Sequence, residues 1–308
     1  METSTDMLLT KNDPIGKSTS MQESGPARSV ESFGRQIPNA NKLAPGDFTQ
    51  WVAAAYKAAI SGVLGANLAS ALLIRRPRAV VEYWQNCLFV WRMIAGQGLP
   101  QRQLHELLPV KEIVDLTILP TTFPFVFWDA NLAKDVLYLA LICRALQPRT
   151  VFEIGTLYGY TALLFALNSP PDAVVHTLDL PPGADFALRT TIIDVRHAAA
   201  HHKTERLLFH GHPLESRIKS LQADSARFDF SPWQAKVDLF FIDGSHSYDY
   251  VRSDTERALG CCRSGSVILW HDYGKWGVNG VSKLLHELSR EYPQLCRLPG
   301  SSLAVLQL

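Results

Sequence analysis

The chain of 308 residues carries 30 Lys and Arg against 29 Asp and Glu, a formal net charge of +1. This balance gives no basic excess of the kind that nucleic-acid binding uses, so we expect no nucleic-acid partner and a small-molecule or glycan acceptor. The five cysteines include the adjacent pair Cys261 and Cys262 but no C-x-x-C motif, which fits neither a disulfide framework nor a zinc site. Composition therefore predicts a cytoplasmic, enzyme-like protein with reduced core thiols.

The N-terminal part of the sequence divides into two regions. Residues 1–46 are rich in Ser, Thr, Asn, Gly and Pro, without apolar periodicity or a signal-peptide stretch, so a disordered tail is expected. Residues 47–146 are expected to form a helical extension, with helical patterns over 79–108 and 131–146.

Residues 51–74 of this extension are apolar apart from Lys57 and are long enough to span a bilayer. Their many Ala, Gly and Ser residues weaken transfer into lipid. We expect helices that pack on the enzyme or on a second subunit as a homo-oligomer, with membrane association as the alternative.

From residue 147 to 308, apolar strands alternate with helical stretches. Runs such as VDLFFID and SVILWHD lack polar alternation, which is typical of parallel strands covered on both faces. The last two strands are joined by Pro299-Gly300-Ser301, too short a connection for a crossover, so this pair must be antiparallel. Strands are predicted near 150–154, 174–179, 218–223, 237–243, 266–270, 294–298 and 303–308, and helices near 159–168, 185–202, 249–261 and 279–291.

The segment VFEIGTLYGYTA, residues 151–162, predicts a buried strand, a tight turn and the start of a helix. Gly155 and Gly159 allow close approach of a ligand to the backbone, and the helix directs free N–H groups at it. The spacing is neither G-x-G-x-x-G nor a P-loop. With Glu153 at the strand end and Thr161 in the first helical turn, the segment resembles motif I of class I S-adenosylmethionine (SAM) methyltransferases, although two glycines in a turn can also be purely structural.

Acidic residues follow the next two strands, and ligands of open α/β sheets bind at this edge. Asp179 is placed to accept hydrogen bonds from ribose hydroxyls, or alternatively to cap a helix. Asp224 and Ser225 would lie beside an adenine, or alternatively form a turn for local hydrogen-bonding reasons.

The resemblance grows more specific downstream. EIGTLYGYTA, TLDLPP, ADS, FIDGSHSYDYVRSDTERAL and WHDY occur in the order and spacing of the methyltransferase-24-like branch of SAM methyltransferases, from about Gln103 to the C-terminus. The resemblance extends to catechol and caffeoyl-CoA O-methyltransferases. It implies an α/β fold of about seven strands with the last antiparallel, and a SAM-binding domain over residues 147–308.

The same resemblance implies a metal site and a base. Asp243, which is also expected near the cofactor, would bind a divalent cation together with His271 and Asp272, and His246 would be the general base. The chain departs from the catechol pattern with His271 in place of an acid and Asp272 in place of an amide. This ligand set suits Mn²⁺, Fe²⁺ or Zn²⁺ better than Mg²⁺. Alternatively, the acids only cap the sheet edge and orient the histidines.

The sequence thus predicts a SAM-dependent methyltransferase that acts on a hydroxyl of a small molecule or sugar. His246, with an ordinary pKa of about 6.5, would accept the proton as a neutral imidazole. Two alternatives remain: an oxygenase similar to the cephalosporin hydroxylases, and a binding module that keeps the SAM pocket without catalysis.

Overall fold

The computed structural model describes residues 88, 98–110, 113, 115–119, 130–191, 194, 195, 198, 207–275 and 278–308. These residues belong to one compact unit, 69–308. The predicted tail and residues 51–74 lie outside the described part of the chain.

The described strands form one seven-stranded sheet in the order β3-β2-β1-β4-β5-β7-β6. Neighbours from β3 to β5 are parallel, whereas β7 is antiparallel to both β5 and β6. The predicted fold class, with its single reversed strand, is therefore confirmed. The strands are β1 Thr150–Ile154, β2 Val174–Asp179, β3 Ile218–Gln222, β4 Val237–Ile242, β5 Cys262–Trp270, β6 Cys296–Arg297 and β7 Ala304–Gln307.

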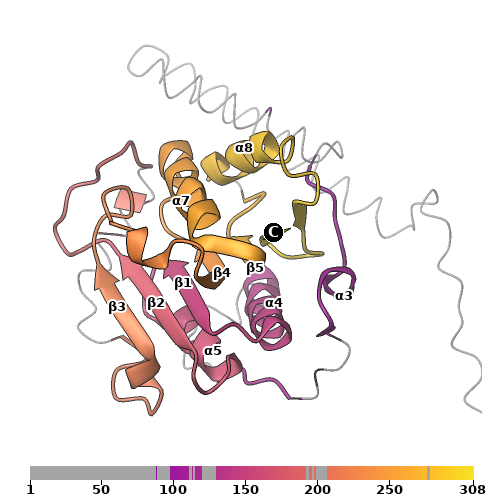
Figure 1. Cartoon of the computed structure of the whole chain (residues 1–308). Coiled ribbons are helices and arrows are strands. Elements are labelled where there is room, and N and C mark those ends of the chain that lie inside the picture. Colours follow the sequence, from indigo (N-terminus) through magenta and orange to yellow (C-terminus); the bar gives the residue numbers. More distant parts are fainter. Residues whose placement is uncertain are drawn as a thin grey trace, which may run out of the picture. The chain divides into compact units, whose positions relative to one another are not determined.

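Helices cover both faces of this sheet (Figure 1). On one face lie α4, Ala130–Leu146, and α5, Tyr160–Asn168; on the other lie α7, Tyr248–Cys261, and α8, Asn279–Leu288. The short helix α3, Leu104–Leu107, precedes them. Two 3₁₀ turns, Glu215–Arg217 and Ser231–Trp233, flank β3.

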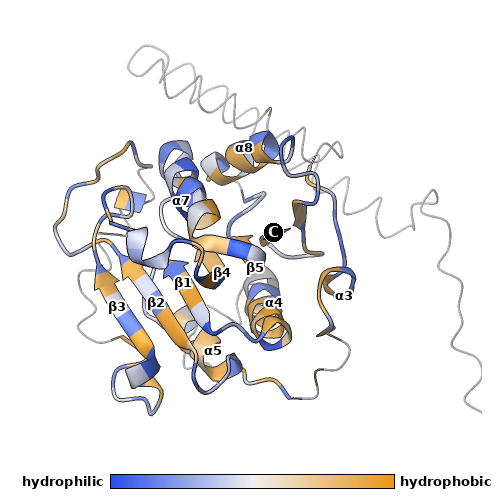
Figure 2. Cartoon of the chain, viewed as in Figure 1, coloured by the Kyte–Doolittle hydropathy of each residue, from blue (hydrophilic) through white to orange (hydrophobic). Residues whose placement is uncertain are grey.

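Alternation of side chains along the strands divides the core in two. Val151 and Phe241 pack under α4 and α5, whereas their neighbours Phe152 and Phe240 pack under α7 and α8. Figure 2 shows hydrophobic residues along the strands and on α4 and α5. Because α4 contributes Val136, Leu139 and Ile142 to this core, it packs as part of the α/β domain, although the sequence had placed it in the extension.

Two predicted helices differ in the structure. Residues 185–191 are not helical, and the first described helical residue of this stretch is Asp194. Residues 98–103 are not helical, because Gly98 and Pro100 disfavour a helix, and Gln101 forms a bridge with Arg297.

Within the described residues, no helix is both long and apolar enough to cross a bilayer. Four cysteines, Cys143, Cys261, Cys262 and Cys296, are free and buried there.

Candidate active site

The carboxyl ends of β1 to β5 surround a cavity of about 960 Å³. It lies where the strand order reverses, with β1 between β2 and β4, the usual ligand position in open α/β sheets. Nine expected site residues line it, namely Gly155, Thr161, Asp179, Asp224, Ser225, Asp243, His246, His271 and Asp272. The volume lies at the upper end of that of small-molecule and cofactor sites.

The turn after β1 requires its two glycines for packing. Gly155 has φ +102°, and a Cβ there would lie 2.1 Å from the carbonyl oxygen of Asp243. Gly159, the N-cap of α5, has φ +76°, and a Cβ there would lie 2.6 Å from the ring of Phe209. Gly155 lines the cavity and Gly159 does not.

Glu153 does not line the cavity either. Its side chain is fully buried and accepts a hydrogen bond from the Thr177 hydroxyl at 2.6 Å. Burial, together with the charges of Asp243 and Asp179, raises the pKa of Glu153 well above its ordinary value despite this hydrogen bond. The structure therefore places Glu153 beneath the cavity as a buried acid.

The acids after β2 and β3 hold backbone amides. Asp179 accepts hydrogen bonds from the N–H groups of Leu157, at 3.2 Å, and Leu180, at 2.9 Å. Asp224 accepts from the N–H groups of Ala187 and Ala226 and from the Tyr250 hydroxyl, the last at 2.7 Å. We call Gly155, Asp179, Asp224 and Ser225 the amide half of the site.

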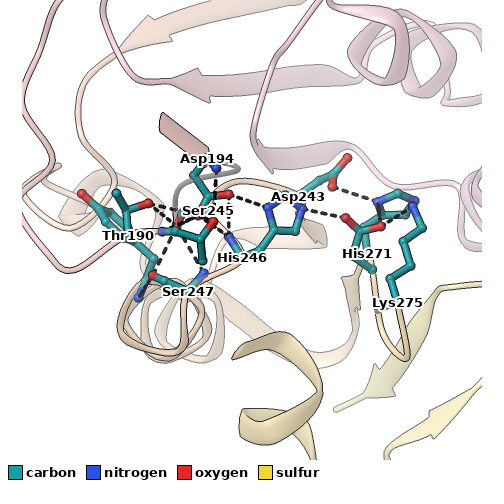
Figure 3. A network of polar contacts seen from close by, with 11 residues as sticks. Thr190, Asp194, Asp243, Ser245, His246, Ser247, His271 and Lys275 are labelled. Carbon is teal, nitrogen blue, oxygen red and sulfur yellow. Dashed lines mark hydrogen bonds and ion pairs between the residues drawn. The ribbon is translucent and has the colours of Figure 1, made fainter. Parts of the chain in front are cut away.

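The acids after β4 and β5 instead pair with cationic side chains. Figure 3 shows Asp194, His246, Asp243 and His271 within this network of polar contacts. We call Asp243, His246, His271, Asp272 and Lys275 the ion-pair half. His246 lies between two carboxylates, with Nδ1 2.6 Å from Asp194 and Nε2 2.6 Å from Asp272.

This position corrects the expectation of a neutral His246. Burial opposes the imidazolium, but hydrogen bonds and charges from Asp194 and Asp272 outweigh burial and raise the pKa of His246 to about 10. The imidazole is therefore protonated at neutral pH in this arrangement, and both ring nitrogens donate.

Asp194 belongs to the segment that crosses from β2 toward β3. Besides His246 Nδ1, it accepts hydrogen bonds from the backbone N–H of His246 and from the hydroxyl groups of Thr190, Thr191 and Ser245. With these donors and the Thr191 N–H around it, Asp194 fixes both the main chain and the ring of His246.

His271 supports Asp243 from the side of α4. Its Nδ1 lies 2.9 Å from Asp243 and 3.0 Å from Asp272, and its Nε2 lies 3.2 Å from Asp135 on α4. Asp135 is 1% exposed and also accepts hydrogen bonds from Ser301 and Ser302 in the turn between β6 and β7. Both ring nitrogens of His271 are thus engaged with carboxylates.

Among the described residues, two acids and one histidine could hold a divalent cation, and this histidine is not the one expected from the sequence. Ligand atoms of Asp243, His246 and Asp272 all lie within 4.8 Å of one another. Two carboxylates and an imidazole are a reasonable donor set for Mn²⁺, Fe²⁺ or Zn²⁺. The candidate set therefore differs from the predicted one by having His246 in place of His271.

Asp135, Asp194 and Lys275 were missed in the sequence. Asp135 could have been found as the single acid of the mainly apolar helix ANLAKDVLYLALICRAL. Asp194 completes a T-x-x-D capping pattern with Thr191, whose hydroxyl accepts from the Asp194 N–H while Asp194 accepts from the Thr191 N–H. No local sequence pattern marks Lys275 as a site residue.

Similar solved structures include three methyltransferases. The O-methyltransferase of tomaymycin synthesis from Streptomyces achromogenes, solved with SAM, is 20% identical over 55% of this chain and 72% of that chain, with a TM-score of 0.37. The Bacillus cereus O-methyltransferase, solved with SAH (S-adenosylhomocysteine), is 18% identical over 58% and 83%, with a TM-score of 0.39. A Podospora anserina methyltransferase bound to SAH is 16% identical over 60% and 82%, with a TM-score of 0.41.

No curated protein matches the chain. The strand ends that build the cavity fall within one continuous segment, from β1 to the turn after β5. That segment, residues 152–273, matches the model of a methyltransferase-domain family, which confirms over this part of the chain the resemblance inferred from its motifs.

Proposed function

We propose that this protein is a SAM-dependent methyltransferase that transfers a methyl group to a hydroxyl of a small molecule or sugar. The observation that carries the proposal is that one cavity joins two halves of different chemistry. One half is suited to a nucleoside, and the other holds a histidine with an orienting acid.

In the amide half, SAM would bind with its methionine end over Gly155 and its ribose on Asp179. Each oxygen of Asp179 accepts one backbone hydrogen bond, and a carboxylate has about four acceptor positions in all. Ribose hydroxyls would donate to this same carboxylate. Asp224 and Ser225 would lie beside the adenine, and Thr161 on α5 would line the site.

In the ion-pair half, His246 would accept the proton of the acceptor hydroxyl at Nε2. The hydroxyl oxygen attacks the SAM methyl carbon, the carbon–sulfur bond breaks, and SAH leaves with the bonding pair on sulfur. Asp194 on Nδ1 orients the ring and stabilises the imidazolium that forms, as an acid does for the base in other activated nucleophiles. His246 can do this only once Asp272 has withdrawn from Nε2 and the ring has lost its proton.

A divalent cation is a second component of the proposal, held by Asp243 and Asp272 with His246 as the third donor in the set. When bound, such a cation would lower the pKa of an acceptor hydroxyl. Nε2 of His246 cannot bind a cation and accept a proton at once. His246 therefore acts either as a ligand or as the base. If it is a ligand, EDTA should abolish turnover; if it is the base, turnover should persist in EDTA.

Calorimetry with SAM and detection of SAH test the function. The proposal expects SAM binding and, with a hydroxyl acceptor, formation of SAH without oxygen consumption. Oxygen uptake without SAH would support the hydroxylase-like alternative, and SAM binding without turnover on any acceptor would support the binding module. The small-molecule or sugar acceptor, the absence of a nucleic-acid partner and homo-oligomer assembly through residues 47–146 are further predictions.

A further inference from the structure

Asp272 is surrounded by three cationic side chains. Its Oδ2 lies 2.6 Å from His246 Nε2, and its Oδ1 lies 3.0 Å from His271 Nδ1 and 2.5 Å from Lys275 Nζ. The two histidines are each held by a second acid, Asp194 or Asp135. Lys275 lines the cavity as both histidines do, but it differs from them because it reaches Asp272 from a flexible stem and is held by no second acid in the contacts of the described residues.

The backbone that carries Lys275 is fixed. Asp272 has φ +63°, and the Lys275 N–H donates back to the Asp272 carbonyl, at 3.3 Å. Between them, Tyr273 bonds through its hydroxyl to the Leu99 N–H, and the Gly274 N–H bonds to Ser282. This turn places the ammonium over the carboxylate of its own strand end.

The side chain itself can leave. Lys275 is 39% exposed, compared with 11% for Asp272, so its four-carbon stem has a path to solvent. A lysine ammonium is a compact point charge on a flexible stem, and it can separate from one carboxylate without disturbing the backbone.

We propose that Lys275 is an internal counter-cation that occupies, at Asp272, the place a divalent cation would take, and so competes with divalent cations for the cavity. This inference rests on the cation site of the proposed methyltransferase. The four carboxylates of the cluster, Asp135, Asp194, Asp243 and Asp272, face three cationic side chains, one of which is Lys275. A divalent cation must therefore displace the ammonium from Asp272 or bind beside it against its charge.

The test is Mn²⁺ binding by calorimetry, with free Mn²⁺ followed in parallel by electron paramagnetic resonance. Lys275→Met keeps the length of the stem and removes the charge, so it should bind Mn²⁺ ~10-fold or more tightly than the wild type. Lys275→Arg keeps the charge and should bind as weakly as the wild type. Lys219→Met, which removes an exposed lysine on β3 that does not line the cavity, is the matched control and should change nothing.

Equal Mn²⁺ affinity in wild type and Lys275→Met would overturn the proposal, and so would the absence of Mn²⁺ binding in all four proteins. In the second case SAM calorimetry would still decide the methyltransferase function separately. If Lys275→Met does not unfold cooperatively, Lys275→Gln takes its place. In the wild type, Mn²⁺ should also increase labelling of Lys275 by an amine-reactive ester, mapped by mass spectrometry, without changing Lys219.

Discussion

The amide half and the ion-pair half of the cavity both present aspartates at strand ends, but they satisfy them differently. Asp179 and Asp224 accept hydrogen bonds from neutral donors, namely backbone N–H groups and the Tyr250 hydroxyl. Asp243 and Asp272 are paired with His271, His246 and Lys275. Neutral donors hold a carboxylate without cancelling its charge, so the amide half is preorganised for a ligand. In the ion-pair half, a cationic side chain must first separate from its carboxylate before the site can act.

The largest effect is expected from breaking the ion-pair half at His246. His246→Ala should reduce turnover ~10²–10⁴-fold, because the acceptor hydroxyl loses its proton acceptor, while SAM affinity stays nearly unchanged. The measurement is SAH formation alongside SAM calorimetry. His105→Ala, at an exposed position on α3 outside the cavity, is the control. Turnover within a few-fold of the wild type would leave His246 a structural residue.

The next effect comes from the turn on which the amide half is built. Gly155→Ala should lower the free energy of unfolding by ~2–4 kcal/mol, because it adds a backbone clash with Asp243 to a positive φ. Gly183→Ala separates the two causes, since Gly183 has φ +75° but a Cβ there would have no atom within 4 Å. Its cost should be ~1 kcal/mol. Urea unfolding measures both, and equal costs would show that packing against Asp243 contributes nothing.

A third change tests whether the amide half binds the nucleoside. Asp179→Ala should weaken SAM binding by ~1.5–3 kcal/mol, roughly ten- to more than a hundred-fold, because a charged acceptor is lost. Asp172→Ala removes an exposed acid paired with Arg149 outside the cavity and should leave SAM affinity unchanged. Calorimetry that gives both variants the wild-type affinity would contradict the assignment of Asp179.

The smallest effect concerns an acid that belongs to neither half. Asp254 on α7 is fully buried, and burial, together with the charge of Asp224, raises its pKa to about 7 against the charge of Arg257. The folded protein therefore binds this proton more tightly than the unfolded chain, whose carboxyl has a pKa of about 3.9. Between about pH 4 and 7 this group makes stability fall as pH rises.

Asp254→Asn should remove that pH dependence. At pH 8 it should raise the free energy of unfolding by ~1–2 kcal/mol, because the buried charge is gone while the amide still has to be desolvated. Urea unfolding at pH 5 and pH 8 measures this difference. A variant less stable than the wild type at pH 8 would show that the Asp254 carboxylate is stabilised in the fold.

The sheet could be predicted from sequence because buried parallel strands are continuous apolar runs, as in VDLFFID and SVILWHD. The acids at the strand ends could be predicted as site residues as well, since the carboxyl ends of such strands meet at one edge of the sheet. The charge state of His246 could not be predicted, because it depends on Asp194, 52 residues away in the chain. The position of Lys275 depends on the left-handed backbone of Asp272, an unusual conformation for a residue other than glycine.

Gly155 has a consequence for the evolution of such domains. Its missing side chain lets the chain just after β1 pack against the carbonyl of Asp243, which directly follows the neighbouring strand β4, whether or not a cofactor is bound. Selection on folding alone would therefore keep this glycine in a descendant that had lost the reaction. His246 and Asp194 would be free to drift in that descendant, so their joint loss, with Gly155 retained, is the signature expected of a relative that binds without catalysing.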